Sequence, residues 1–197
     1  SLGNTYSNDE LFDFDKRIKK LTNNNISYTC ELKYDGVSIS LSYKEGVLFR
    51  ALTRGDGTQG DDVTTNVKTI KSIPLQLQGS YPSLFEIRGE IFIPHAGFEA
   101  MNIEREQAGL ETFANPRNTA SGSLKLQDSS EVSKRKVNCF IYSLNSNIYG
   151  LNTQEDCLKF LKKIGFNVPN TYKKCENIDE VKSYINKWDK KRHDLDV

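Results

Sequence analysis

The chain has 197 residues, enough for one full domain or two small ones, and its 27 Lys and Arg nearly balance its 26 Asp and Glu. The resulting net charge of +1 means that any nucleic-acid binding must come from a local patch. The lack of a long apolar run or signal peptide indicates that the protein does not span a membrane, and four cysteines without a Cys-Xaa-Xaa-Cys pair predict free thiols in a cytoplasmic protein rather than a zinc site or disulfides.

Hydrophobic periodicity predicts one helix and three strands in the first part of the chain. Apolar residues at helical spacing follow a capped, acidic start, whereas alternating apolar and polar residues mark the strands. The elements are a helix over residues 7 to 21 and strands over residues 28 to 33, 37 to 44 and 47 to 54. A turn at Glu45-Gly46 joins the last two strands as a hairpin. Lys33 is therefore expected at the end of one strand and beside the next.

Lys33 lies in the stretch Glu31-Leu32-Lys33-Tyr34-Asp35-Gly36 and has two interpretations. In the structural one it is a solvated charge that discourages pairing at a sheet edge. In the chemical one it is a nucleophile that attacks phosphorus to give a lysine phosphoramidate, which requires burial, nearby cations or a metal-bound phosphate to make the free amine accessible. Gly36 would then let the backbone turn tightly beside a bound nucleotide.

A glycine-rich loop follows the third strand. Residues 53 to 62 contain three glycines within six positions, and such a loop lets the backbone pass close to a ligand. Most loops of this kind are only turns, but Arg54 makes this one a candidate phosphate or sugar contact. Asp61 and Asp62 are expected to cap a helix that continues to Ile70.

The next strand, over residues 85 to 94, places three charged residues on one face. Glu86, Arg88 and Glu90 alternate with apolar residues, and their burial would be costly unless they pair or line a wet cleft. The strand therefore carries either an ion-paired surface ladder or a cleft wall. His95 is interpreted as the start of a helix rather than as a catalytic base.

The block over residues 113 to 125 predicts a short helix that begins with proline and consists of small residues. Arg117 and Lys125 lie about two turns apart on it and are expected to be prominent cations. A strand over residues 137 to 144 holds Tyr142, and amphipathic helices are predicted over residues 152 to 164 and 178 to 192. These elements predict an α+β fold in which mostly antiparallel sheets form a cleft with helices packed outside.

With these blocks identified, the chain resembles the adenylation (nucleotidyltransferase) domain of bacterial NAD-dependent DNA ligases. Four blocks carry the resemblance, in the family's order: residues 30 to 36, 52 to 57, 87 to 90 and 113 to 124. Lys-Xaa-Asp-Gly alone is shared with ATP-dependent ligases and capping enzymes. The Thr-Arg-Gly-Asp-Gly and Asn-Pro-Arg-Asn blocks are the ones that resemble the NAD-using branch.

The resemblance implies a nucleotidyltransferase (ATP-grasp-like) fold around a nucleotide cleft, and sealing of nicked double-stranded DNA with NAD and Mg²⁺ by a cytoplasmic monomer. It implies a role in DNA replication and repair. The catalytic residues would be Lys33 and Asp35. The cofactor-binding residues would be Glu31, Lys33, Arg54, Glu90 and Tyr142, with Tyr142 stacked on adenine. The nucleic-acid or phosphate contacts would be Arg117, Lys125 and Arg88, and no residue is expected to ligate a metal.

Two departures from the family pattern qualify these expectations. Lys125 stands where many members carry an arginine, so the charge is kept but the planar fork is lost. No Asp-Gly-Xaa-Xaa-Xaa-Lys strand follows residue 142. Residues 1 to 197 are therefore expected to be a truncated adenylation domain, without the NMN-binding, OB, zinc-binding, helix-hairpin-helix and BRCT domains. Zn²⁺ would belong only to the full-length protein, and the chain alone is expected to be inactive or nearly so with NAD.

Two other functions fit part of the sequence. An ATP- or GTP-using nucleotidyltransferase, such as an RNA ligase or a capping enzyme, would share Lys-Xaa-Asp-Gly. A non-catalytic nucleic-acid-binding module would use Lys33 as one cation in a patch with Arg54, Arg88, Arg117 and Lys125. A covalent adenylate on Lys33 separates the enzymes from the module, and the choice between NAD and ATP separates the two enzymes.

Overall fold

The computed structural model describes residues 3 to 22, 25 to 55, 59 to 146, 148 and 150 to 197, and the chain divides into two compact units. Unit 1 comprises Ser1–Leu32 and Thr171–Leu195, and unit 2 comprises Lys33–Asn170 and Asp196–Val197. Within the described residues, no helix has the length and apolar character needed to cross a membrane. All four cysteines are free thiols.

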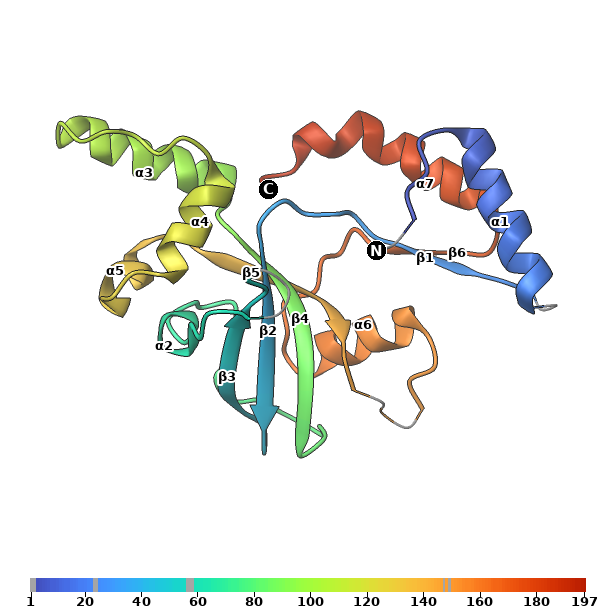
Figure 1. The fold of residues 1–197 in the computed structure, drawn as a ribbon, viewed down its shortest axis with the longest axis horizontal. Coiled ribbons are helices and arrows are strands. Elements are labelled where there is room, and N and C mark those ends of the chain that lie inside the picture. The colour runs from blue at the N-terminus through green and yellow to red at the C-terminus, as the bar shows by residue number, and fades with distance from the viewer. Residues whose placement is uncertain (1–2, 23–24, 56–58, 147, 149) are drawn as a thin grey trace. The chain divides into compact units, whose positions relative to one another are not determined.

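Unit 1 is a two-stranded antiparallel sheet with two helices (Figure 1). Its elements are α1 (Asn8–Thr22), β1 (Tyr28–Cys30), β6 (Lys173–Cys175), α7 (Ile178–Lys191) and the 3-10 helix η1 (Arg192–Asp194). The predicted strand over residues 28 to 33 is too long, because β1 ends at Cys30 opposite Lys173, where β6 begins. Lys33 consequently lies beyond the strand, in an irregular segment. The two helices predicted for this unit are confirmed.

A small core and a buried carboxylate hold unit 1 together. The core consists of Leu11, Cys175, Ile178, Val181 and Tyr184, with Trp188 packed against it. Asp15 is only 5% exposed and accepts hydrogen bonds from Lys19, at 2.8 Å, and from the Tyr28 hydroxyl. These bonds, that of Lys19 first, lower the pKa of Asp15 below its usual range. Asp15 therefore links α1 to β1 as an ionised group.

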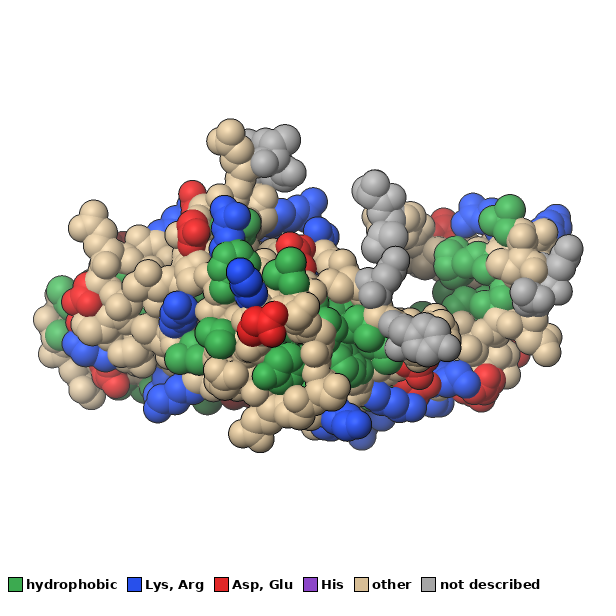
Figure 2. Space-filling view, turned by 90° about the horizontal axis from the view of Figure 1, so that it is seen from below, with side chains coloured by type: hydrophobic (Ala, Val, Ile, Leu, Met, Phe, Trp, Pro, Cys, Tyr) green, Lys and Arg blue, Asp and Glu red, His purple; other side chains and the backbone are tan. Residues whose placement is uncertain are grey.

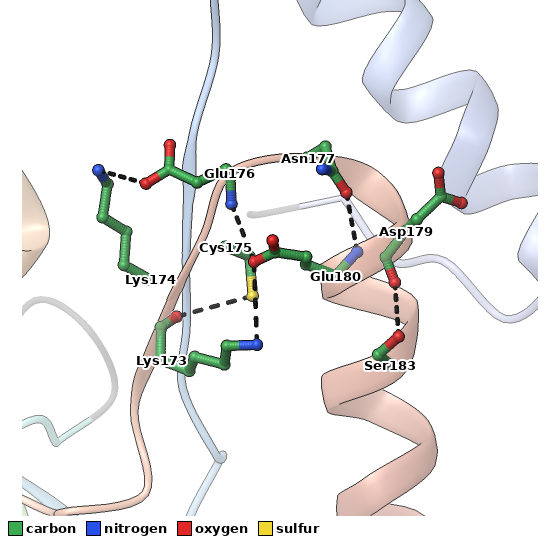
Figure 3. Close-up of polar contacts among 8 residues, drawn as sticks. All are labelled: Lys173, Lys174, Cys175, Glu176, Asn177, Asp179, Glu180 and Ser183. Atoms are coloured by element: carbon green, nitrogen blue, oxygen red, sulfur yellow. Dashed lines mark hydrogen bonds and ion pairs between the residues drawn. The ribbon is translucent and has the colours of Figure 1, made fainter.

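The start of α7 is tied to β6 by a reciprocal set of polar contacts (Figure 3). The side chain of Asn177 accepts a hydrogen bond from the backbone N–H of Glu180 at 3.0 Å. The Glu180 carboxylate in turn accepts one from the backbone N–H of Glu176 at 3.3 Å and lies 3.8 Å from the ammonium of Lys173. Two backbone donors at the helix start are thereby satisfied, as in a capping box.

Unit 2 is built on a four-stranded antiparallel sheet with strand order β3-β2-β4-β5. The strands are β2 (Val37–Lys44), β3 (Val47–Thr53), β4 (Leu84–Phe92) and β5 (Asn138–Leu144). The helices are α2 (Thr64–Val67), α3 (His95–Gln107), α4 (Pro116–Leu124), α5 (Ser129–Lys134) and α6 (Gln154–Lys163). The predicted α+β class with antiparallel sheets and accompanying helices is confirmed.

The two faces of this sheet differ as the sequence alternation predicts. Buried side chains on one face include Ile39, Leu41, Tyr43, Ile87, Ile91 and Ile141, and they share the core of unit 2 with Leu158 and Leu161 of α6. The opposite face, called here the polar sheet face, carries Ser38, Ser40, Ser42, Glu86, Arg88, Glu90 and Tyr142. The hydroxyls of Ser38 and Tyr142 lie 3.4 Å apart on it.

The sheet ends in the predicted hairpin turn. Glu45 and Gly46 have φ angles of 48° and 75°, the left-handed conformation that a two-residue hairpin loop requires. Exposed apolar side chains surround this end of the sheet, namely Val47, Phe49, Leu75 and Leu84. Figure 2 views the molecule from the side on which the hairpin ends and shows hydrophobic side chains there among Lys and Arg.

The helix predicted through Ile70 is shorter than expected. α2 ends at Val67, because the carbonyl of Asn66 accepts bonds from both the N–H and the hydroxyl of Thr69, which turns the chain more tightly than an α-helix. The predicted Asp62 cap is not formed, because the N-cap position of α2 is Val63, which has no side-chain cap; Asp62 precedes it and accepts a hydrogen bond from the Thr64 N–H at 3.0 Å. Asp61 does not cap α2 either, since its carboxylate binds Lys125 instead. α5 and β6 were not predicted.

Candidate active site

Four of the predicted site residues come together in unit 2: Lys33, Asp35, Glu90 and Arg117. Lys33 and Asp35 lie in the segment before β2, Glu90 in β4 and Arg117 in the first turn of α4. The register of β2 with β4 pairs Ser38 with Glu90, which brings the start of β2 beside this carboxylate. The guanidinium Nη1 of Arg117 donates a hydrogen bond to Oδ1 of Asp35 at 3.1 Å.

Glu90 lies at the centre of this group and is half-buried. Burial raises the pKa of its carboxyl above the usual range, against the attraction of Lys33, a hydrogen bond from the backbone N–H of Gly36 and the attraction of Arg117. Asp35 is also close enough to act on Glu90, in the raising direction. A carboxyl group whose pKa is shifted by burial among two cations and a backbone donor is typical of a functional site.

Gly36 allows the segment that carries Lys33 to approach β4. A Cβ atom at this position would lie 2.3 Å from the carbonyl oxygen of Ile91 and 3.0 Å from Cγ of Glu90. Gly36 does not have a positive φ angle. Glycine is therefore required here by close approach and not by the tight turn that the sequence suggested.

An aromatic row also fixes the segment that carries Lys33. The ring of Tyr34 lies 4.7 Å from that of Phe140 in β5, and Phe140 stacks on Phe92 of β4 at 4.6 Å. Tyr34 separates Lys33 from Asp35 in the sequence. Packing of Tyr34 therefore restricts the backbone on which both charged residues are carried.

The position of Arg117 follows from the Asn-Pro-Arg-Asn block. The side chain of Asn115 caps α4 by accepting from the N–H of Asn118 at 2.7 Å, and Pro116 occupies the first helical position. Asn102 of α3 holds the preceding Phe113 by two hydrogen bonds to its backbone, of 2.8 and 3.2 Å. α3 thereby fixes the start of α4.

Tyr142 and Arg88 extend the site along the polar sheet face. The backbone carbonyl of Tyr142 accepts a hydrogen bond from Gln154 of α6 at 2.7 Å, and its hydroxyl lies near that of Ser38. Ser38 is the register partner of Glu90, so the aromatic ring shares a face with the central carboxylate. Arg88 lies two residues before Glu90 on the same strand and is exposed.

Arg54 and Lys125 lie at the glycine-rich loop. Arg54 directly follows β3 and is exposed; within the described residues, no hydrogen bond or ion pair joins it to the four central residues. Lys125 forms an ion pair with Asp61 at 2.8 Å. Gly55 has a φ angle of 56°, and a Cβ on Gly60 would lie 1.9 Å from the Thr53 carbonyl oxygen, so the described ends of this loop lie against each other. Its residues 56 to 58 lie outside the described residues.

Glu31 is the one predicted site residue that belongs to unit 1. Its place in an adenine pocket beside Lys33 stays a prediction. Over the part of the chain that the structure describes, no three His, Cys, Asp or Glu side chains are grouped as a metal site would require.

Three residues that support the site were missed by the sequence reasoning, namely Asn66, Asn102 and Phe140. Asn66 is 7% exposed and Asn102 is partly buried. For Asn66 and Asn102 the only available signal was an asparagine inside a helical segment, where asparagine is a poor helix former and its buried amide needs hydrogen-bond partners.

Comparison with known proteins identifies the family. A family model described as the NAD-dependent DNA ligase adenylation domain matches residues 1 to 197. The DNA ligase of Flavobacterium johnsoniae is 55% identical over 196 residues, which cover 99% of this chain and 29% of that protein. The DNA ligase of Christiangramia forsetii is 54% identical over 195 residues, which again cover 99% of this chain and 29% of that protein. That of Petrotoga mobilis is 48% identical over 198 residues, 100% of this chain and 29% of the relative.

The chain thus spans less than a third of the length of these curated relatives. The match covers all four sequence blocks and both structural units. The chain belongs to the family of NAD-dependent DNA ligase adenylation domains.

Proposed function

We propose that this chain carries the nucleotidyl-transfer site of a DNA ligase that seals nicks in double-stranded DNA. Lys33 Nζ attacks the adenylyl phosphorus of NAD, which forms a P–N bond and releases nicotinamide mononucleotide. The AMP group then passes to the 5′-phosphate of the nick, and Lys33 is regenerated. Attack by the 3′-hydroxyl on the activated phosphate forms the phosphodiester and releases AMP. The convergence of Lys33, Asp35, Glu90 and Arg117 is the observation that supports this proposal.

The charges around Lys33 suit phosphoryl transfer. An arginine near the reacting phosphate stabilises the negative charge on its oxygens, and the Arg117 guanidinium reaches the Lys-Tyr-Asp-Gly segment through its hydrogen bond to Asp35. Glu90 and Asp35 offer acceptors for sugar hydroxyls and for the proton that leaves the amine.

The polar sheet face would form the wall of the nucleotide cleft. Tyr142 presents an aromatic ring on this face, and such a ring suits stacking on adenine. Glu31 would line the adenine pocket and Arg54 would contact phosphate or sugar. Mg²⁺ would be held mainly by the substrate phosphates, which is its usual mode of binding in nucleotidyl-transfer sites, and no residue of this chain is assigned to it as a ligand.

Contacts to the nicked DNA would come from the exposed cations Arg88, Arg117 and Lys125. Because the net charge is only +1, binding depends on these local charges and on the segments of longer relatives that this chain does not span. A role in DNA replication and repair, a cytoplasmic location and a monomeric state belong to the same proposal.

Intact-mass measurement after incubation with NAD and Mg²⁺ tests the proposal. We expect a protein extended at both ends to the length of its relatives to gain one adenylyl group, and this chain alone to gain little or none. Lys33→Ala should abolish the gain. Lys44→Ala, which removes an exposed lysine from the far end of β2, should leave it unchanged.

Other outcomes of this experiment point to other functions. A gain with ATP but none with NAD would indicate the ATP-using class. No gain with either nucleotide, together with strongly salt-dependent DNA binding, would indicate a non-catalytic nucleic-acid-binding module. A gain that survives Lys33→Ala would exclude Lys33 as the nucleophile.

A further inference from the structure

A buried asparagine holds the backbone on both sides of Lys125. Asn66 in α2 is 7% exposed, and its side-chain Nδ2 donates hydrogen bonds to the carbonyl oxygens of Leu124 at 2.7 Å and Leu126 at 2.8 Å. Lys125, the residue between them, follows the last residue of α4. The last carbonyls of a helix lack partners within the helix, so a side chain that binds two carbonyls around one residue fixes the helix end.

The side chain of Lys125 is bound by Asp61, which lies five residues before Asn66 in the same segment of the chain. Its ammonium lies 2.8 Å from a carboxylate oxygen of Asp61, and both side chains are more than half exposed. Asp61 is itself anchored to Thr53, whose N–H donates to the Asp61 carbonyl and whose hydroxyl accepts from the Asp61 N–H, both at 3.0 Å. Residues 61 to 66 therefore hold Lys125 through its backbone and through its charge.

This arrangement compensates for a property of lysine. A lysine is a flexible point charge without the rigid fork of an arginine, so its direction depends on how firmly its backbone and counter-ion are placed. An exposed ion pair contributes little to stability, so Asp61 can be displaced from Lys125 by a ligand with stronger negative charge. A nucleic-acid phosphate is such a ligand.

We infer that Asn66 is a positioning residue that fixes Lys125 for a phosphate of the nucleic-acid backbone, and that Asp61 is the counter-ion which this phosphate displaces. The inference rests on the proposed function, in which Lys125 contacts phosphate. To that function the inference adds Asn66 and Asp61, as the residues that control the contact between Lys125 and phosphate.

A double-mutant cycle on the protein extended to the length of its relatives tests the inference, with a fluorescent nicked duplex as the probe. The variants are Asn66→Leu, Lys125→Ala and the double variant, and the readout is the dissociation constant across salt concentrations. The dissociation constant rises between about 50 and 200 mM salt, and a variant that lacks one phosphate contact should show a rise about threefold smaller than the wild type. We expect this change in Lys125→Ala, a partial change in Asn66→Leu, and no further change when Asn66→Leu is added to Lys125→Ala.

A matched control separates positioning from general loss of structure. Asn167→Leu removes a similar bond, from the Asn167 amide to the Cys139 carbonyl at 3.0 Å, elsewhere in unit 2, and should leave the salt dependence unchanged. If Asn66→Leu weakens binding equally with and without Lys125, the inference is overturned while the phosphate contact stands. If Lys125→Ala has no effect on binding, the contact in the proposed function fails as well.

A second variant keeps the test decisive if Asn66→Leu does not fold. Asp61→Asn changes an exposed side chain and removes the counter-ion, so it should tighten binding of the nicked duplex a few-fold at low salt, and only while Lys125 is present. Unchanged or weaker binding would contradict the inference. A parallel titration with NAD distinguishes the source of the phosphate, because an effect on NAD without one on DNA would overturn the assignment to nucleic acid.

Discussion

Arg117 and Asp35, which are separated by 82 residues in the sequence, form an ion pair with 3.1 Å between Nη1 and Oδ1. The pair joins the start of α4 to the Lys-Tyr-Asp-Gly segment. Their side chains are 61% and 76% exposed, so the pair is screened by water and contributes little to folding stability. Its significance lies in placing a guanidinium near Lys33 and Glu90.

Replacement of Arg117 should therefore affect adenylation far more than stability. We expect Arg117→Ala to lower the rate of self-adenylation by about 10²-fold or more, the usual effect of removing a donor to developing charge. Arg117→Lys should recover only part of this rate, because the charge is retained without the fork. Intact-mass time courses on the extended protein measure the rate, and a thermal-unfolding midpoint close to that of the wild type shows that the fold is retained. A large fall in the midpoint would contradict the functional interpretation.

Glu90 should reduce stability while supporting activity. Burial raises the pKa of Glu90 in the folded chain, so folding favours the neutral carboxyl. The folded chain is therefore most stable below the unfolded-state pKa of Glu90, and it loses stability as pH rises through the folded-state pKa. Glu90→Gln removes this loss of folding stability, because the glutamine amide stays neutral at every pH. The variant should unfold at a higher temperature than the wild type at neutral pH, and the difference should vanish below about pH 4.

The same variant should adenylate poorly, because an amide cannot replace the carboxylate as a proton or hydroxyl acceptor. Thermal unfolding across pH and intact mass at neutral pH measure the two effects. A Glu90→Gln protein that is less stable at neutral pH would show that the attraction of Lys33 and Arg117 outweighs burial.

The elements that were predicted correctly are those whose signal is local. The alternation in residues 37 to 44 and the turn at Glu45-Gly46 specify the central hairpin, and apolar spacing with a capped start specifies α7. β6 was missed because it has three residues, and its pairing with β1 is formed by segments more than a hundred residues apart. The same pairing ends β1 early, which no local pattern could reveal.

For the site, the sequence predicted which residues take part but not which of them contact one another. The motif blocks identified Lys33, Asp35, Glu90 and Arg117, and the structure brings these four together. The sequence could not show that Arg117 pairs with Asp35 while Lys125 pairs with Asp61, because each contact depends on tertiary packing of α4. Asn66 was overlooked for the same reason, since its partners are backbone carbonyls.

Gly36 should not tolerate a methyl group. Its Cβ would lie 2.3 Å from the Ile91 carbonyl oxygen, which belongs to the β2–β4 ladder and cannot move without disturbing the pairing. We expect Gly36→Ala to destabilise unit 2 by about 1–3 kcal/mol and to abolish adenylation. Gly122→Ala is the matched control, because it has open space within α4 and should be neutral or stabilising by about 0.5–1 kcal/mol. Urea unfolding of the two variants gives both values, and equal stability would remove the close-approach argument.

Asp15 should stabilise unit 1 in a pH-dependent way. Its carboxylate is buried and its pKa is lowered by hydrogen bonds from Lys19 and Tyr28, so its contribution is present above the unfolded-state pKa and is lost as pH falls through the folded-state pKa. We expect Asp15→Asn to cost about 1–3 kcal/mol at neutral pH, and the cost to shrink in acid. Trp188, the single tryptophan, lies in this unit and reports its urea unfolding by fluorescence.

Asp13→Asn is the control for Asp15→Asn: it removes an exposed pair with Lys16 and should change stability by less than about 0.5 kcal/mol. A cost for Asp15→Asn that is the same at neutral and acidic pH would show that lost packing, and not the charge, accounts for it.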